Sequence, residues 1–125
     1  MDTLNKSDLT FSVIEQTSKQ FGISLSVAAI RLTQLFQENA ALIWHDGERV
    51  LWKVRSETCY LKISGVISVA ALAHKTNDSK WDINGNIEPR YWLENEVENL
   101  ICEEESHYFY KLKKYLTILK FYFDY

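Results

Sequence analysis

Five residues whose side chains bind metals or transfer protons lie close together late in the chain: Cys102, Glu103, Glu104, Glu105 and His107. Thiolate, carboxylate and imidazole groups are the usual protein ligands of zinc. Successive side chains of a strand point to opposite faces, so a strand here places Glu103, Glu105 and His107 on one face. No second Cys or His group lies nearby in the sequence to complete a tetrahedral site. We therefore expect local ion pairs or a solvated face here, and no metal.

Nucleophilic catalysis by a cysteine is the other chemistry that these residues could support. It requires a histidine within hydrogen-bonding distance of the thiol, and Cys102 and His107 are the candidates. Cys59 lies in ETCYLKI, a predicted strand, where a buried and inert thiol is expected. The four glycines are dispersed and form no phosphate-binding loop. The sequence thus predicts no catalytic residues and no cofactor.

Length and charge set the class of protein. A chain of 125 residues is expected to form a single domain, residues 1–125, and its net charge of −3 gives no general attraction to nucleic acid or anionic membrane. The two cysteines form no paired motif, which indicates free thiols in a reducing compartment. The start of the chain lacks the pattern of a signal peptide, and no stretch reaches the roughly 18 apolar residues of a spanning helix. We expect a cytoplasmic protein that is not in a membrane.

The elements that would position such residues begin with a helix that ends near Phe21. Its predicted inner face follows spacings of three and four residues and consists of Phe11, Ile14, Ser18 and Phe21. Thr10 or Ser12 is the predicted N-cap. Gly22 follows the last periodic residue, where a left-handed backbone commonly closes a helix.

A second helix follows after about three residues, with Ser24 or Ser26 as its N-cap. Its apolar positions keep the helical period and comprise Ala28, Ala29, Leu32, Leu35 and Phe36. Two helices joined by a short turn built on glycine are typical of a helix-turn-helix.

A β-hairpin is predicted next, from strands over residues 41–45 and 48–55 around a two-residue Asp46-Gly47 turn. Trp44 and Trp52 would then pack as a direct or a diagonal cross-strand pair. Residues 1–56 therefore have the order of a winged helix-turn-helix, with the hairpin as the wing.

The second part, residues 57–125, is predicted to be mixed and mainly β. Residues 65–77 suit either a short helix capped by Ser68 or a buried strand, and residues 75–86 indicate a loop. Strands are expected in NIEPRYWL, NLICEEESHYF and KKYLTILKFYFDY. The last one is apolar on both faces near its start, so this chain or a partner must cover it. The predicted class is α+β: a helix-turn-helix pair, a hairpin wing and a C-terminal antiparallel sheet.

Several short motifs resemble the region that follows the catalytic part of ImmA/IrrE-family proteins, which are zinc peptidase-like regulators. They are Phe21-Gly22-Ile23-Ser24, Ala28-Ala29-x-Arg31-Leu32, Arg55-Ser56, Tyr91-Trp92-Leu93, Glu104-Glu105-Ser106 and Tyr115-Leu116-Thr117-Ile118-Leu119. The family's peptidase activity requires an HExxH helix. His45, His74 and His107 do not begin that motif, so the resemblance implies only a non-catalytic regulatory module. Glu104 and Ser106 then form a turn or a polar anchor.

A protein partner or a second copy of the chain is the predicted ligand. Exposed positions expected on the second helix include Ser26, Val27, Ile30, Arg31, Thr33 and Gln34. In a chain that is rich in aromatic residues, exposed apolar side chains such as those of Val27 and Ile30 are typical of a protein interface. We predict Val27, Ile30, Arg31 and Gln34 as the partner-binding face.

A DNA-binding transcriptional regulator is the alternative. Arg31 and Gln34 would read bases in the major groove. Phosphate contacts would come from Lys19 at the end of the first helix and from Arg49, Lys53 and Arg55 on the hairpin. The segment 110–115 also interleaves tyrosines with lysines, as some single-strand-binding surfaces do.

Overall fold

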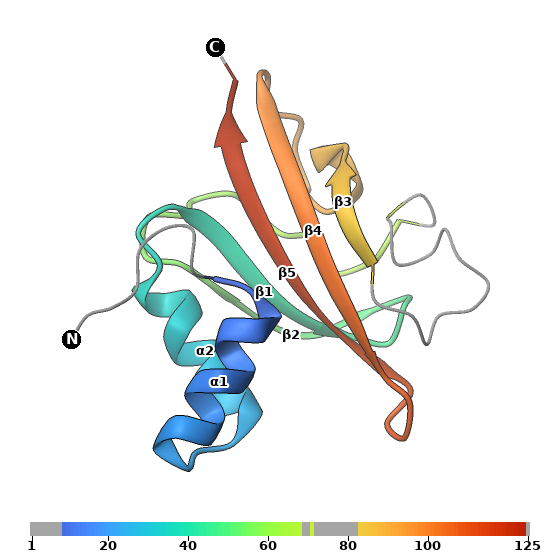
Figure 1. Ribbon diagram of the computed structural model, residues 1–125. Coiled ribbons are helices and arrows are strands. Elements are labelled where there is room, and N and C mark those ends of the chain that lie inside the picture. Colours follow the sequence, from blue (N-terminus) through green and yellow to red (C-terminus); the bar gives the residue numbers. More distant parts are fainter. Residues whose placement is uncertain (1–8, 69–70, 72–82, 125) are drawn as a thin grey trace.

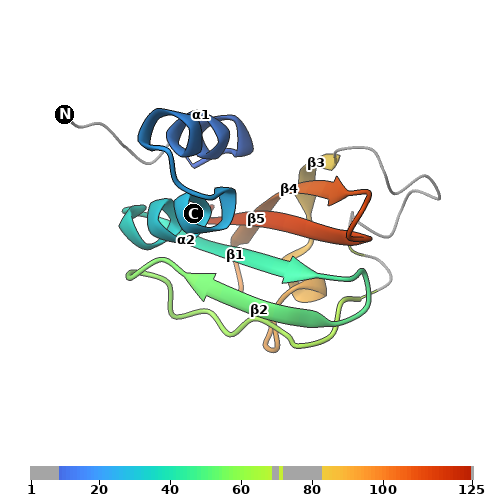
Figure 2. The same ribbon diagram turned by 90° about the horizontal axis from the view of Figure 1, so that it is seen from below.

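The computed structural model describes residues 9–68, 71 and 83–124. Their elements are α1 (Phe11–Phe21), α2 (Leu25–Leu35), β1 (Asn39–His45), β2 (Val50–Arg55), β3 (Ile83–Ile87), the 3-10 helix η2 (Pro89–Tyr91), β4 (Leu100–Phe109) and β5 (Lys114–Phe123). The strands form one antiparallel sheet in the order β2-β1-β5-β4-β3, and both helices lie against one face of it (Figures 1 and 2). The predicted α+β class is confirmed. Neither α1 nor α2 nor any other described helix is long and apolar enough to cross a membrane.

Helix α1 begins and ends, and helix α2 begins, where the sequence predicts. Thr10, rather than Ser12, caps α1, because its side chain accepts a hydrogen bond from the Val13 N–H. Gly22 closes α1 with a φ of 64°, in the left-handed region that glycine adopts without strain. Ser24 caps α2 through the N–H of Val27.

The β1–β2 hairpin has a longer connection than the predicted two-residue turn. His45 pairs with Val50, which leaves four residues between them, and the Asp46 carboxylate accepts hydrogen bonds from the N–H groups of Arg49 and Glu48. Those bonds hold the pKa of Asp46 below its usual value. Strand β1 also pairs with β5, so the hairpin is one side of the five-stranded sheet.

Strand β5 lies in the middle of the sheet, between β1 and β4. Its residues 115–119 are buried, with Leu116 and Ile118 toward the helices and Leu119 and Phe121 toward the opposite side. The prediction that this strand must be covered on both faces is therefore met by the chain itself.

Each face of the sheet has its own hydrophobic core. The helix-side core contains Ile14, Ala29, Leu32, Leu42 and Ile118. The opposite core contains Ile43, Ile63, Trp92, Leu119 and Phe121. On this far side the sheet is covered by stretches that are mostly neither helix nor strand, within residues 57–68 and 88–98.

Three expectations for the second part of the chain are wrong. Residues 57–63 form no strand beyond an isolated bridge from Ile63 to Leu93, and Pro89 begins a 3-10 helix in the segment predicted as a strand. Residues 83–86, predicted as loop, belong to β3, because Asn84, Gly85 and Asn86 pair with β4. Pairing with a distant strand outweighs the low β propensity of Asn and Gly. Most of the segment 65–77 lies outside the described residues.

Helix α1 is attached to the sheet by a pair of side chains on β4. The backbone N–H of Phe11 donates to both oxygens of Glu105 at 3.3 Å, while His107 Nε2 lies 2.8 Å from the Glu105 carboxylate. The Phe11 ring stacks on His107 with centroids 3.8 Å apart. Burial raises the pKa of Glu105, but the hydrogen bond and charge of His107 and the N–H of Phe11 outweigh it and lower the pKa overall. A carboxylate at a helix N-terminus also interacts favourably with the helix dipole.

We predict that Glu105→Gln lowers the free energy of unfolding by about 1–2 kcal/mol at pH 7, because it removes a charge-assisted cap of α1. A lowered folded-state pKa contributes stability that is present above the unfolded value of about 4.3 and is lost as the pH falls through the folded value. The wild type and the variant should therefore converge in urea unfolding at acid pH. Glu15→Gln, on the exposed surface of α1, is the control, and an equal loss in it would contradict the assignment.

Candidate functional site

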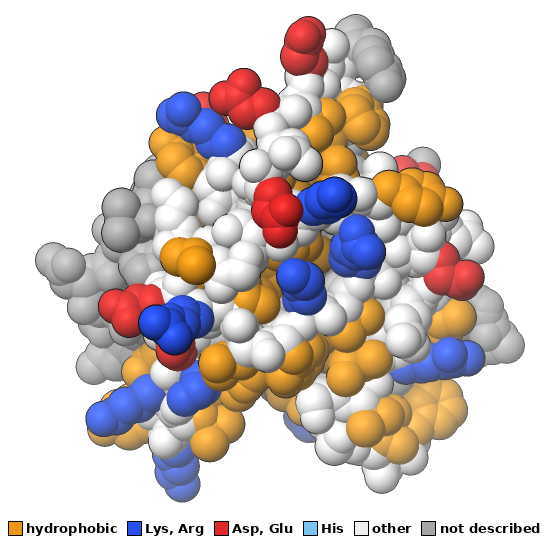
Figure 3. Space-filling model, turned by 180° about the vertical axis from the view of Figure 1, so that it is seen from behind, with side chains coloured by type: hydrophobic (Ala, Val, Ile, Leu, Met, Phe, Trp, Pro, Cys, Tyr) orange, Lys and Arg blue, Asp and Glu red, His pale blue; other side chains and the backbone are white. Residues whose placement is uncertain are grey.

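An apolar groove opens on the helix side of the sheet, between α2 and the turn that joins β4 to β5. Its volume is about 400 Å³, and it is lined by Leu25, Ser26, Trp44, Trp52, Phe109, Leu112 and Leu116. We call it the aromatic groove. Figure 3 shows it from behind as a hollow with hydrophobic side chains, between the lobe of the helices and the lobe of the β4–β5 turn.

Strand register builds the floor of the groove. Trp52, Trp44 and Leu116 are direct partners across β2, β1 and β5, so they form one row on the face that the helices occupy. The two tryptophan rings are stacked with centroids 6.3 Å apart, and Phe109 lies 5.6 Å from Trp44. The direct Trp pair is one of the two arrangements that the sequence allowed.

The β4–β5 turn forms the outer wall. The N–H groups of Leu112 and Lys113 both donate to the carbonyl of Phe109, and Lys113 has a φ of 55°. This tight turn leaves Tyr110 73% and Leu112 58% exposed. Because they stand beside the apolar groove, they extend its apolar surface, and contiguous exposed apolar patches commonly mark interaction sites.

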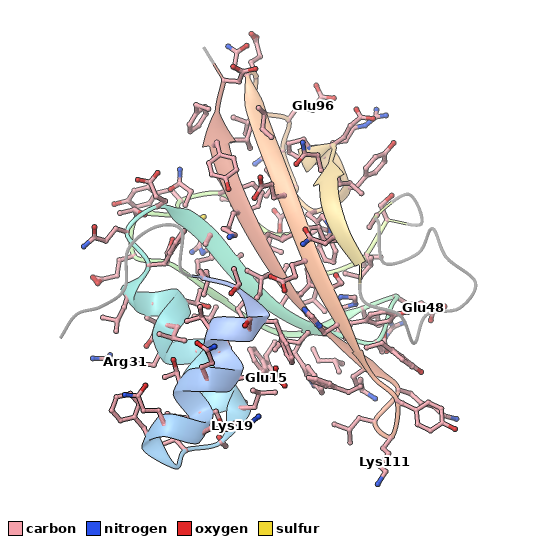
Figure 4. All side chains as sticks on the ribbon, viewed as in Figure 1. Glu15, Lys19, Arg31, Glu48, Glu96 and Lys111 are labelled. Atoms are coloured by element: carbon pink, nitrogen blue, oxygen red, sulfur yellow. The ribbon has the colours of Figure 1, made fainter. Side chains whose placement is uncertain are left out.

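The described lining of the groove is uncharged, and lysines are concentrated on the turn that forms its outer wall. None of the described lining residues is acidic, and the turn carries Lys111, Lys113 and Lys114. Asp46 interacts with Lys114. Figure 4 shows Lys111 at the tip of the turn, across the opening from Glu15 and Lys19 on α1.

The predicted partner-binding residues form a stripe on α2, because positions 27, 30, 31 and 34 share one side of a helix. Val27, Arg31 and Gln34 are exposed. Ile30 is instead partly buried and packs against the helix-side core, while Thr33 is fully buried and donates to the Ala29 carbonyl. The stripe begins at the end of α2 where Leu25 and Ser26 line the groove.

The six residues predicted for DNA lie on two sides of the molecule. Lys19, Arg31 and Gln34 belong to the helical layer. Lys53 and Arg55 pair with Ile43 and Ala41 of the opposite core, and they donate to the carbonyls of Ile63 and Leu61. Arg49 is in the hairpin connection. The sheet therefore separates the basic residues of β2 from those of the helices.

The acidic segment of β4 has the predicted alternation. Glu103, Glu105 and His107 share the helix-side face, but Glu103 accepts a hydrogen bond from Tyr122 whereas Glu105 contacts His107. Burial and the Glu103 carboxylate raise the pKa of Tyr122 to about 12. Within residues 9–68, 71 and 83–124, no three His, Cys, Asp or Glu residues are arranged to hold a metal ion.

Both thiols are buried. Burial raises the pKa of Cys59 and of Cys102, and the carboxylates of Glu104 and Glu103 contribute further at Cys102. A high pKa keeps a thiol protonated and therefore weakly nucleophilic.

A chain of buried polar side chains crosses the far side of the sheet, which sequence reasoning did not predict. It joins His45 of β1, Thr117 of β5, and Ser106 and Glu104 of β4 to Trp92. All five are at most 1% exposed. Each step is a hydrogen bond of 2.6–2.8 Å, so this is a fully buried polar network.

The direction of the network follows from its ends. Gly47 N–H donates to His45 Nδ1 at 3.1 Å, so Nδ1 is an acceptor and Nε2 carries the hydrogen. His45 then donates to Thr117, Thr117 to Ser106, and Ser106 to Glu104 Oε2. The other oxygen of Glu104 accepts the indole N–H of Trp92. Since no solvent reaches these groups, we interpret the network as structural, and Glu104 and Ser106 as the polar anchor that the sequence suggests.

We predict that Thr117→Val costs about 2–3 kcal/mol of unfolding free energy, because it leaves the buried Nε2–H of His45 without its acceptor and the buried hydroxyl oxygen of Ser106 without its donor. Thr33→Val, also fully buried but bonded to a helix carbonyl that already has a backbone donor, should cost less than about 1 kcal/mol. Urea unfolding of both variants measures the difference. Equal costs would show that the network contributes no more than an isolated hydroxyl.

The groove is the feature that the sequence pointed to least directly. Trp44, Trp52 and the segment 110–115 were each singled out, but the strand order that brings β1, β2 and the β4–β5 turn together is not a local signal. The chain matches no model of a known protein family and no curated protein.

Proposed function

We propose that this chain is a non-catalytic interaction module that binds a protein partner in the aromatic groove. The observation that carries the proposal is an apolar hollow of about 400 Å³ with two stacked tryptophans in its floor. Interfaces are enriched in Trp, Tyr and Phe, and a few such residues in a pocket usually supply most of the binding energy. The resemblance to the non-catalytic region of ImmA/IrrE-family proteins supports a regulatory role.

The surroundings of the groove support a protein ligand. Tyr110 and Leu112 extend its wall into solvent, and Val27, 53% exposed, begins the α2 stripe at its other side. Together with the groove, these side chains form an apolar surface that is interrupted in places and has polar and basic residues around it. An apolar centre with a polar rim is the usual anatomy of a protein interface.

The state of the reactive side chains supports a non-catalytic role. Cys59 and Cys102 are buried with raised pKa values, and His45 is sealed in the polar network. His107 is paired with Glu105 and covered by the ring of Phe11. The packing or hydrogen bonding of each of these groups explains its presence without a catalytic role.

Site-specific photocrosslinking tests the proposal. Benzoylphenylalanine in place of Leu112 should crosslink to a protein in cells of the native host, because residue 112 lines the groove. The same group in place of Leu51, which is 47% exposed, should not. Ser26→Trp, which fills the groove from α2, should abolish the crosslink at 112. No crosslink at 112, or one that Ser26→Trp leaves unchanged, would refute the proposal.

Winged helix-turn-helix binding to DNA is the second candidate, supported by the α1–α2 corner at Gly22 and the exposed Arg31 and Gln34. It would use phosphate contacts that release counterions. Light scattering with generic duplex DNA at low and moderate salt distinguishes the two. We expect no complex; one that forms at low salt, dissociates as salt rises and is weakened by Arg31→Ala would favour the DNA-binding function instead.

A further inference from the structure

We infer that the aromatic groove takes an amphipathic helix with acidic residues on its flank, contributed by a different protein. This inference rests on the proposed function and specifies the partner's chemistry. It is carried by the pairing of the strands in the floor and by the distribution of charge around the groove.

The groove lies on the face of the sheet, where an extended peptide cannot pair with strands, and of the floor strands only β2 is an edge strand. Strand β1 is paired on both sides by β2 and β5, β5 by β1 and β4, and β4 by β5 and β3. The edge strand β2 is met at its start by the chain itself, where the Val50 N–H donates to Gly65 and Ile67 donates to Glu48. An extended segment in an apolar groove would leave its own backbone groups unpaired, at a cost of several kcal/mol.

A helix avoids that cost because its backbone hydrogen bonds are internal. Helices that bind in grooves insert apolar side chains spaced at i, i+3 or i+4, and i+7. The groove offers Leu25 on one wall, Leu112 on the other, and the Trp44–Trp52 pair between them. These contacts are apolar side chains, which is what the apolar stripe of such a helix requires.

The lysines at the rim of the groove favour a partner that carries negative charge. Lys111 and Lys113 lie on the turn beside Leu112, and Lys114 begins β5 directly after it. With no acidic residue among the described lining, carboxylates on the flank of the bound helix would meet lysines near a partly desolvated surface. Opposite charges there favour binding and exclude basic partners.

The same charge argues against a second copy of this chain. A symmetric dimer through the groove would bring two lysine-bearing turns toward the same region, and like charges at an interface are unfavourable. The exposed α2 stripe carries a further positive charge, Arg31. The occupant is therefore a separate protein.

Labelled peptides of about 18 residues, roughly five helical turns, test the inference by fluorescence anisotropy. One has Leu at helical spacing with Glu elsewhere, one has the same composition scrambled, and one has Lys in place of Glu. We expect the first to bind best. Lys111→Glu with Lys113→Glu should weaken it about tenfold, whereas Lys62→Glu, on the exposed segment after β2, should leave it unchanged.

The outcomes separate this inference from the proposed function. The inference of an acidic helix is overturned if the scrambled or the lysine peptide binds as well as the first peptide. It is also overturned if Lys111→Glu with Lys113→Glu does not weaken binding. A groove-dependent crosslink at 112 to a second copy, or to a partner without such a helix, overturns it while the interaction module stands. Binding of the chain to vesicles of phosphatidylcholine and phosphatidylglycerol, lost in the same double reversal, would make the lysine turn a membrane contact and also overturn it. If no crosslink forms at residue 112, both this inference and the proposed function are refuted.

Discussion

The burial of a carboxylate in the middle of the sheet constrains the rest of the structure. Glu104 is 1% exposed, and Trp92 and Ser106 both donate to it, which offsets the cost of burying its carboxyl group. Ser106 in turn needs Thr117, and Thr117 receives the hydrogen of His45. Strands β1, β5 and β4 must therefore be adjacent and in one register, since a slip by a single residue would move these groups to the other face.

The two faces of β5 are consequently covered by different kinds of structure. The far side is closed by irregular segments that supply Trp92 and seal the network. The other side is covered by two helices of eleven residues each, which are too short to cover its whole length. At the end of the face that bears the groove, the helices leave Trp52 and Trp44 partly exposed, in a row that the buried Leu116 completes. The groove is thus the remainder of a face whose other part is core.

Local signals predicted the elements whose ends depend on neighbouring residues. Thr10, Gly22 and Ser24 set the helix limits through bonds within a few residues, and β4 and β5 follow from their own patterns. The features that the sequence did not predict depend on contacts with residues far along the chain. Asn84 and Asn86 are strand residues because β4 pairs with them, and Thr33 is buried because the helix packs around it. The groove needs the strand order β2-β1-β5-β4, which no segment specifies alone.

The attachment of α1 links this architecture to the site. Glu105 holds the first N–H of α1, and Phe11 stacks on His107 while its ring also contacts Phe109, at 6.1 Å. Phe109 lies against Trp44 in the groove. Phe11 therefore connects the anchor of α1 to Phe109, which lines the groove. Because α2 packs on α1, the attachment of α1 to Glu105 and His107 also bears on where α2 places Leu25 in the wall of the groove.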